Sequence, residues 1–115
     1  MMIEEYDRYI EDALSDLLPL AIKRDIDLTL EPTFDGGDKA SMSCMMHRPD
    51  KDRYGIICVE VYEFPDDDIV YFIFDPKLYK YAKMEGFDQA GMVTDIDVFK
   101  KVSKEQYFNH MVGVD

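Results

Sequence analysis

The sequence predicts an α+β fold in which an N-terminal helix packs on a four- or five-stranded antiparallel β-sheet (a meander), with short C-terminal helices. The central observation is a pair of runs, 54–64 and 69–74, that are rich in β-branched and aromatic residues and are separated by Pro65 and three aspartates. This pattern is typical of a β-hairpin. Both runs are apolar at successive positions, which places them in the middle of the sheet. A chain of 115 residues has room for one core, so we expect a single domain, 1–115.

Residues 3–22 provide the second observation, because their apolar side chains recur at the spacing of an amphipathic helix. Lys23 and Arg24 follow in the last turn, where cations suit the helix dipole. Pro19 lacks an amide hydrogen and its ring clashes with the preceding turn, so we expect a kink or a break near Ser15. The apolar stripe consists of Ile3, Tyr6, Ile10, Ala13, Leu17 and Leu20.

Two further strands are expected before the hairpin. Residues 26–34 have a strand pattern, and Pro32 assigns them to the edge of the sheet. Residues 40–47 form the next strand after a three-residue turn at 35–37, where glycine supplies the left-handed conformation. Loops at 48–53 and 65–68 then fix the register. The pairs expected across the three loops are Leu30–Met42 and Leu28–Cys44, then Met42–Val59 and Cys44–Ile57, and then Phe64–Ile69, Val61–Phe72 and Val59–Phe74.

This register gives the sheet two faces of different character. One face is apolar throughout, and we expect the N-terminal helix to cover it. The other face is half apolar and carries Tyr62, Tyr71 and Ile73. We expect either the C-terminal segment or a second copy of the chain, in a two-fold homodimer, to cover this face. Cys44 and Cys58 point to opposite faces, which excludes a disulfide between them.

The C-terminal third contains signals for two helices and a strand. The Asp-Pro pair at 75–76 is a typical helix start, and the helix is expected to span 76–86. Residues 92–102 are a candidate fifth strand. Ser103 and Gln106 have the spacing of a capping box, which predicts a short last helix.

The net charge of −12 is unevenly distributed along the chain. Residues 1–75 hold 19 Asp and Glu against 7 Lys and Arg, whereas residues 76–115 hold six of each. Such a surface disfavours direct binding to nucleic acid or to anionic membranes and favours a basic protein partner. No apolar run has the length of a membrane span, and the acidic N-terminus is unlike a secretory signal. We therefore expect a cytoplasmic protein, in the host cell cytoplasm if it is encoded by a phage.

No residue pattern predicts catalysis, a metal site or a cofactor. The three aspartates at 66–68 lack the spacing of a calcium loop, and consecutive turn residues point in divergent directions. His47 and His110 belong to no zinc motif. A Cys44–His47 catalytic pair is excluded because the two residues lie on one strand with opposite parity. The sequence therefore predicts a protein that is not an enzyme.

Acidic residues from three segments are expected to meet at one end of the sheet. In an antiparallel meander, the turns after the first and third strands emerge at the same end, and a helix folded back over the sheet returns its N-terminus there. These segments supply a candidate partner-binding surface of about seven carboxylates, whose charge density resembles that of nucleic acid phosphates. The residues are Glu4, Glu5, Asp35, Asp38, Asp66, Asp67 and Asp68.

Three functions agree with this surface. The first is a small acidic inhibitor that mimics nucleic acid and occupies a basic nucleic-acid-binding surface of its partner. In composition alone, the chain resembles phage and mobile-element proteins that block restriction or CRISPR effectors. The second is an immunity or antitoxin-like protein that neutralises a nuclease toxin. The third is a structural or oligomeric module whose acidity serves only solubility.

Overall fold

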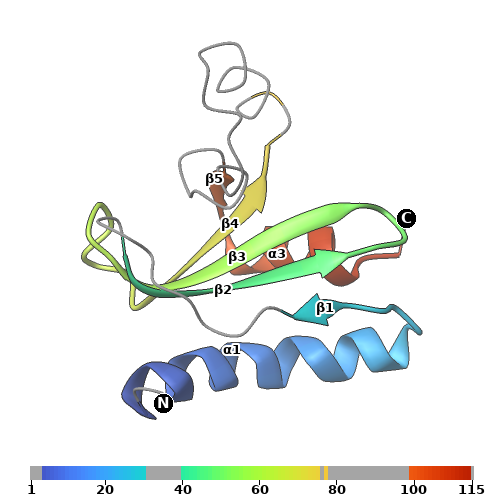
Figure 1. Ribbon diagram of the computed structural model, residues 1–115, viewed down its shortest axis with the longest axis horizontal. Helices are drawn as coiled ribbons and strands as arrows, with labels where there is room; N and C mark the ends of the chain where they lie inside the picture. Colours follow the sequence, from blue (N-terminus) through green and yellow to red (C-terminus); the bar gives the residue numbers. More distant parts are fainter. Residues whose placement is uncertain (1–3, 31–39, 76, 78–98, 115) are drawn as a thin grey trace.

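The fold is built around a five-stranded antiparallel sheet with the strand order β1-β2-β3-β4-β5 (Figure 1). The computed structural model describes residues 4–30, 40–75, 77 and 99–114. Together with two helices at the termini, the sheet gives an α+β fold, as predicted. The elements are α1 (Glu4–Lys23), β1 (Thr29–Leu30), β2 (Ala40–Arg48), β3 (Arg53–Val61), β4 (Ile69–Phe74), β5 (Phe99–Val102) and α3 (Lys104–Val112).

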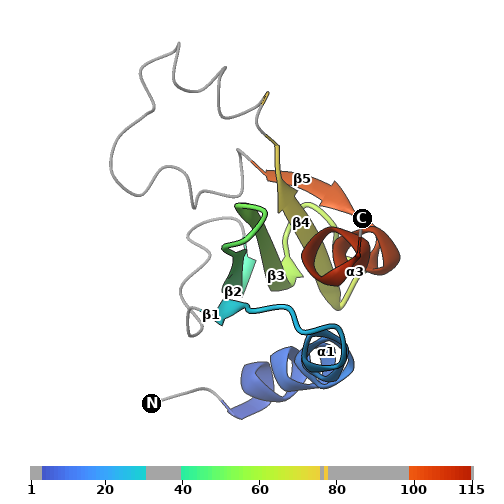
Figure 2. The ribbon, with the colours of Figure 1, turned by 90° about the vertical axis from the view of Figure 1, so that its right-hand side faces the viewer.

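Two buried clusters divide the core. The first contains residues of both helices together with sheet residues, and Figure 2 shows α1 and α3 on the same side of the sheet. The second contains sheet residues only, among those that the structure describes. Cys44 belongs to the first cluster and Cys58 to the second, and both are free thiols, so the predicted opposite orientation is confirmed. The second cluster consists of Ala40, Ile56, Cys58, Val61, Val70, Phe72 and Phe99.

The central β2–β3 pair has the predicted register. Met42 pairs with Val59, and Cys44 pairs with Ile57. The strand pair follows from its apolar pattern and from the short polar loop between Arg48 and Arg53. β3 lies in the interior of the sheet, between β2 and β4.

The predicted register between β3 and β4 is wrong. Val59 pairs with Ile69 rather than with Phe74. Glu60 has a φ of 53°, a left-handed conformation that interrupts the alternation of the strand. β3 then ends at Val61, so the connection spans 62–68 instead of 65–68. The pairing therefore shifts by an odd number of residues, which turns every side chain of β4 to the other face.

The β1–β2 pairing is displaced from the prediction by four residues. Leu30 pairs with Met46 rather than with Met42. Because the displacement is even, Leu28 still packs against the first cluster. β1 is only two residues long, and the predicted turn at 35–37 lies outside the described residues.

Of the predicted kink or break near Ser15, the break does not occur, because α1 continues through Pro19 to Lys23. Ala13, Leu17 and Ala21 recur every four residues and are all buried in the first cluster, so both halves of the helix are anchored in one core. This packing offsets the hydrogen bond that proline removes. The helix ends where Asp25 adopts a φ of 57° and the amide of Ile26 donates to the carbonyl of Ala21.

The capping box at the start of α3 is confirmed. The amide of Gln106 donates to Ser103 Oγ at 3.1 Å, and the amide of Ser103 donates to Gln106 Oε1 at 2.9 Å. The amide of Lys77 donates to Asp75 Oδ1 at 2.9 Å, whereas the rest of the predicted helix at 76–86 lies outside the described residues. Of the candidate strand at 92–102, the described part forms β5.

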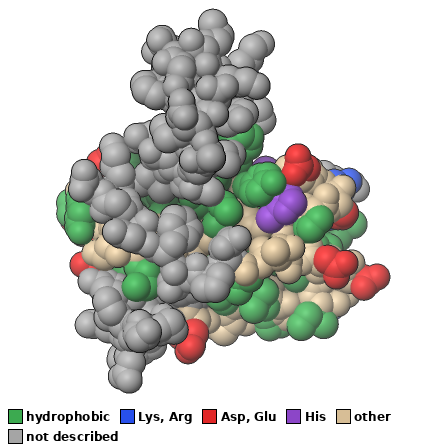
Figure 3. Space-filling model, viewed as in Figure 1, with side chains coloured by type: hydrophobic (Ala, Val, Ile, Leu, Met, Phe, Trp, Pro, Cys, Tyr) green, Lys and Arg blue, Asp and Glu red, His purple; other side chains and the backbone are tan. Residues whose placement is uncertain are grey.

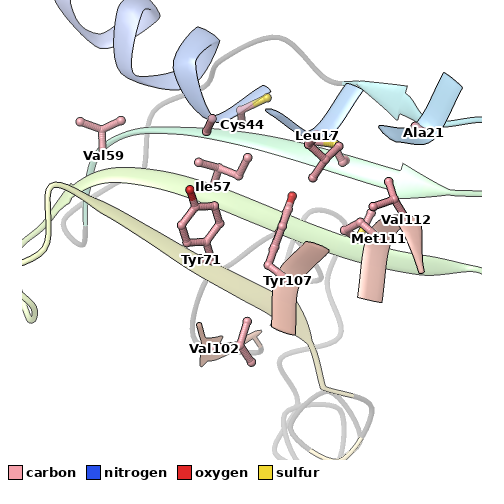
Figure 4. Close-up of a cluster of buried hydrophobic side chains, with 12 residues drawn as sticks. Leu17, Ala21, Cys44, Ile57, Val59, Tyr71, Val102, Tyr107, Met111 and Val112 are labelled. Atoms are coloured by element: carbon pink, nitrogen blue, oxygen red, sulfur yellow. The ribbon is translucent and has the colours of Figure 1, made fainter. Parts of the chain in front are cut away.

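α3 packs closely on the sheet where Tyr107 lies over Gly55. A Cβ placed on Gly55 would lie 2.5 Å from Cε2 of Tyr107 and 3.0 Å from Sδ of Met111. Tyr107 also meets Tyr71 of β4, with ring centroids 5.2 Å apart. Leu17 and Ile57 belong to the same buried cluster, which Figure 4 draws. A residue without a side chain is therefore required in β3 for the tyrosine to reach the backbone of the sheet.

Replacing Gly55 with alanine should destabilise the protein, because the added methyl group overlaps the ring of Tyr107. Overpacking of this kind typically costs about 1–3 kcal/mol. Urea denaturation of Gly55→Ala measures the loss in the free energy of unfolding. The control is the same substitution in a Tyr107→Leu background, where the ring atoms are gone. An equal loss in both backgrounds would show that the ring contact is not the cause.

Candidate functional site

The connection between β3 and β4 presents a dense group of carboxylates to solvent. We call residues 60–68 the acidic connection. Two turns shape it, since Phe64 N donates to the carbonyl of Val61 and Asp67 N donates to the carbonyl of Phe64. Tyr62 is 60% exposed within this segment. The exposed carboxylates are those of Glu60, Glu63, Asp66, Asp67 and Asp68.

Most of this negative charge is not neutralised by described residues. Lys101 Nζ lies 3.5 Å from Asp67 Oδ2 and 4.8 Å from the centroid of the Phe64 ring. The other four carboxylates form no ion pair with any residue that the structure describes. A half-exposed ion pair contributes about 0–1 kcal/mol, so the pair with Lys101 leaves the segment strongly acidic. On the face drawn in Figure 3, acidic side chains outnumber basic ones among the described atoms.

The structure places part of the predicted partner-binding surface. The aspartates at 66–68 lie exposed on the acidic connection. Glu4 and Glu5 open α1, whose first turn lies at the same end of the molecule as the β3–β4 connection (Figure 1). Their side chains are outside the description, as are residues 35 and 38 entirely. The meeting of all three segments therefore stays a prediction.

Sequence reasoning missed Glu60 and Glu63. The run from Tyr54 to Phe64, apolar and β-branched almost throughout, predicts a strand for both residues, and β3 does contain Glu60, whereas Glu63 lies beyond its end. The sequence did contain a signal for these two residues, which is the local density of acidic side chains. Residues 60–68 contain five acidic side chains and one proline. Such a composition favours a solvated turn over the end of a buried strand.

The three residues of the candidate oligomer face do not share one surface. The C-terminal segment, one of the two expected covers, contacts Tyr71 through α3. Tyr71 is only 7% exposed and contacts Tyr107 of α3. Ile73 packs against the first cluster, on the same face of the sheet. Tyr62 instead lies exposed on the acidic connection. The reason is the odd shift in register between β3 and β4, which turned Tyr71 and Ile73 toward the helices.

Three arginines converge on the C-terminal end of α3. Their guanidinium groups donate to the carbonyls that the helix leaves without an internal partner. Cations at this end also suit the helix dipole. We call these residues the arginine clamp: Arg24 Nη1 lies 2.9 Å from the carbonyl oxygen of Val112, Arg48 Nη1 lies 2.7 Å from that of Gly113, and Arg53 Nη1 lies 3.3 Å from that of His110.

Arg48 is the buried member of the arginine clamp, with 3% of its surface exposed. Its Nε and Nη2 donate to the two carboxylate oxygens of Asp50, at 2.8 and 3.4 Å. This hydrogen bonding holds the pKa of Asp50 below its ordinary value. A carboxylate with a lowered pKa stabilises the fold above its unfolded pKa, and this contribution is lost as the pH falls through the lowered value.

The two thiols are buried, and the ring of His47 has partners. Burial raises the pKa of the Cys58 thiol to about 12, although the Ser43 hydroxyl acts in the opposite direction. His47 Nε2 lies 3.0 Å from Asp52 Oδ1, and its ring stacks on Tyr54. Among the described residues, no three His, Cys, Asp or Glu side chains gather closely enough to hold a metal ion.

Neither helix in the described part of the chain is both long and apolar enough to cross a membrane. Comparison of the chain with protein-family models, with curated proteins and with solved structures gives no match.

Replacing Arg48 with methionine should destabilise the protein by about 2–3 kcal/mol, because a buried carbonyl then loses a charged donor. Urea denaturation of Arg48→Met measures this loss. The matched variant is Arg24→Met, which removes an exposed member of the arginine clamp and should cost less than about 1 kcal/mol. Equal losses for the two variants would contradict the assigned importance of Arg48.

The Cys58 thiol should react very slowly in the native protein at pH 8. A pKa of about 12 leaves few thiolates, and the side chain is fully buried. In a Cys44→Ala variant, a thiol-reactive dye should label the native chain at least about a hundredfold more slowly than the same chain in urea. Comparable native and unfolded rates would show that Cys58 is accessible.

Proposed function

We propose that this protein is an inhibitor that binds the basic, nucleic-acid-binding surface of a protein partner through the acidic connection. The observation that carries the proposal is the exposure of five carboxylates within residues 60–68, four of which form no ion pair with a described residue. Closely spaced carboxylates resemble the phosphates of a nucleic acid strand in charge density. Binding, rather than catalysis, is the function that such a surface supports.

The exposed ring of Tyr62 adds an anchor to this surface. Tyrosine is enriched among the residues that contribute most to protein interfaces, because it buries a large rigid surface and retains a polar tip. Here it lies between Glu60 and Glu63, with Asp66 nearby in sequence. An exposed aromatic side chain flanked in sequence by acidic residues suits an interface with a buried centre and a polar rim.

The arginine clamp strengthens the acidic character of the surface. Three of the four arginines in the chain direct their guanidinium groups to backbone carbonyls of the protein itself. Arg48 is buried and is also paired with Asp50. Arginine is the side chain best suited to neutralise carboxylates bidentately, and these arginines are held away from the acidic connection.

Replacing Asp66, Asp67 and Asp68 together with asparagine should slow association with a basic partner by about tenfold at low salt. The difference from the parent should shrink as salt is added, because exposed charges are screened. Stopped-flow measurements over a salt series test this, with a CRISPR effector and a nuclease toxin as the two targets and nucleic acid as the competitor. Binding to only the toxin would assign the immunity function.

The matched control carries Glu11→Gln, Asp25→Asn and Asp27→Asn, which removes the same charge from exposed positions elsewhere. Its association rate should fall much less. Both triple variants should keep the free energy of unfolding within about 0.5 kcal/mol per substitution, since surface changes rarely cost more. A rate that is independent of salt, or equal rates for the two triple variants, would contradict the proposal.

A further inference from the structure

Within the acidic connection, Phe64 and Asp67 together hold the ammonium group of Lys101. Lys101 Nζ lies 3.5 Å from Asp67 Oδ2 and 4.8 Å from the centroid of the Phe64 ring. We propose that these two residues, the Phe64–Asp67 site, receive an arginine side chain of the basic partner, which displaces Lys101. The site belongs to the acidic connection, so its role in partner binding rests on the function proposed above.

The sheet fixes the position of the aromatic ring. Phe64 packs against the second cluster, and its ring centroid lies 6.5 Å from that of Phe72 in β4. Phe72 pairs with Lys101 of β5, and side chains directly opposite each other on neighbouring strands lie on the same face of a sheet. The ring and the lysine are therefore on one face, and packing holds the ring in place without a partner.

A turn places the carboxylate beside this ring. The amide of Asp67 donates to the carbonyl of Phe64 at 3.1 Å, so the two residues lie across one turn. The ring presents the negative face of its quadrupole to a cation, and the carboxylate adds a full negative charge. Lys101 shows which class of group this combination accepts, namely the charged end of a basic side chain.

The contact with Lys101 is weak enough for a partner to displace it. The side chains of Asp67 and Lys101 are 48% and 41% exposed, and ion pairs as exposed as this contribute little to stability. The ammonium of lysine is a compact point charge. Arginine instead carries a planar guanidinium, which forms two parallel hydrogen bonds to a carboxylate and stacks on an aromatic ring. An arginine therefore fits the site better than the lysine that occupies it.

A pocket of about 230 Å³ provides room beside the site. Asp67 and Lys101 line it, together with residues of β4 and β5. Its volume is below that of typical pockets for separate ligands, about 300–1,000 Å³, which suits the entry of a single side chain. Lys104 also lines the pocket, but its ammonium is paired with Asp16 at 3.0 Å.

NMR spectroscopy of the full chain tests the displacement. The probe is a tetra-arginine peptide with blocked termini, and the signal is that of the Lys101 Hε protons, which the ring current of Phe64 shifts. We expect saturable shifts of the backbone amides of Asp66, Asp67 and Asp68, and a return of the Lys101 protons to the values of a solvated lysine. Amide shifts without movement of the Lys101 protons would overturn the inference, and so would the absence of saturation.

A tetra-lysine peptide of the same charge tests the choice of arginine. The arginine peptide should bind about two- to fivefold more tightly, because guanidinium groups stack on the Phe64 ring and bind the carboxylate of Asp67 bidentately. Equal affinities of the two peptides would overturn the assignment of arginine.

Two adjacent lysines supply matched variants. Lys101→Gln removes the occupant of the site. Lys100→Gln removes the same charge one residue away, from a position that pairs with Ile73 on the other face of the sheet. Lys101→Gln should bind the arginine peptide about two- to fivefold more tightly than Lys100→Gln does, because only Lys101 competes for the carboxylate. Equal affinities of the two variants, with amide spectra that show the parent fold, would overturn the inference.

Kinetics with the basic partner separate this inference from the proposed function. Lys101→Gln should dissociate from the partner more slowly than Lys100→Gln, because differences in local contacts appear mainly in the dissociation rate. Equal dissociation rates, together with salt-dependent association, would overturn the role of Lys101 and leave the proposed function standing. Displacement of Lys101 by the peptide in a chain that binds neither target would support the site and reject the proposed function.

Discussion

The contact between Tyr107 and Gly55 is the constraint on which the arrangement of α3 depends. The ring lies directly on the backbone of β3, where any Cβ would overlap it. Its hydroxyl is buried and forms no hydrogen bond with any residue that the structure describes, and burial raises its pKa well above the ordinary value. An unpaired buried hydroxyl costs about 1–3 kcal/mol. The burial of the large aromatic ring offsets this cost, because Tyr107 contributes to the same cluster as Leu17 and Tyr71.

The arginine clamp holds the C-terminal end of α3, whereas Tyr107 holds its first turns. Arg48 and Arg24 bind the carbonyls at this end. These donors come from β2 and from the residue that follows α1, so the C-terminal helix is held by segments far from it in sequence. The same contacts also affect the charge of the surface. They direct guanidinium groups to backbone carbonyls, whereas the carboxylates of the acidic connection stay exposed to water. A chain with this composition therefore presents a more acidic surface than its arginine content suggests.

The sequence was sufficient wherever a short-range signal determined the structure. The capping box at Ser103 and the β2–β3 register follow from residues only a few positions apart. The predicted β3–β4 register was wrong because Glu60 adopts a left-handed conformation. Glycine or asparagine usually signals this conformation, and neither occupies that position. Because of this error, Tyr71 and Ile73 were predicted on the wrong face of the sheet. Two carboxylates of the acidic connection, Glu60 and Glu63, were also left out of the predicted partner-binding surface. The arginine clamp could not be predicted from local sequence patterns, because it joins residues up to 88 positions apart.

The arginine clamp and the acidic connection lie toward opposite ends of β3. Arg53, in the arginine clamp, begins the strand, and Glu60, in the acidic connection, lies near its end. At about 3.3 Å per residue, seven residues separate the two by roughly 23 Å, which exceeds the Debye length of about 8 Å at physiological salt. At the arginine end, guanidinium groups and carboxylates are mixed, whereas the acidic connection has one ion pair among the described residues. A basic partner should therefore be attracted to the end of the sheet that carries the acidic connection.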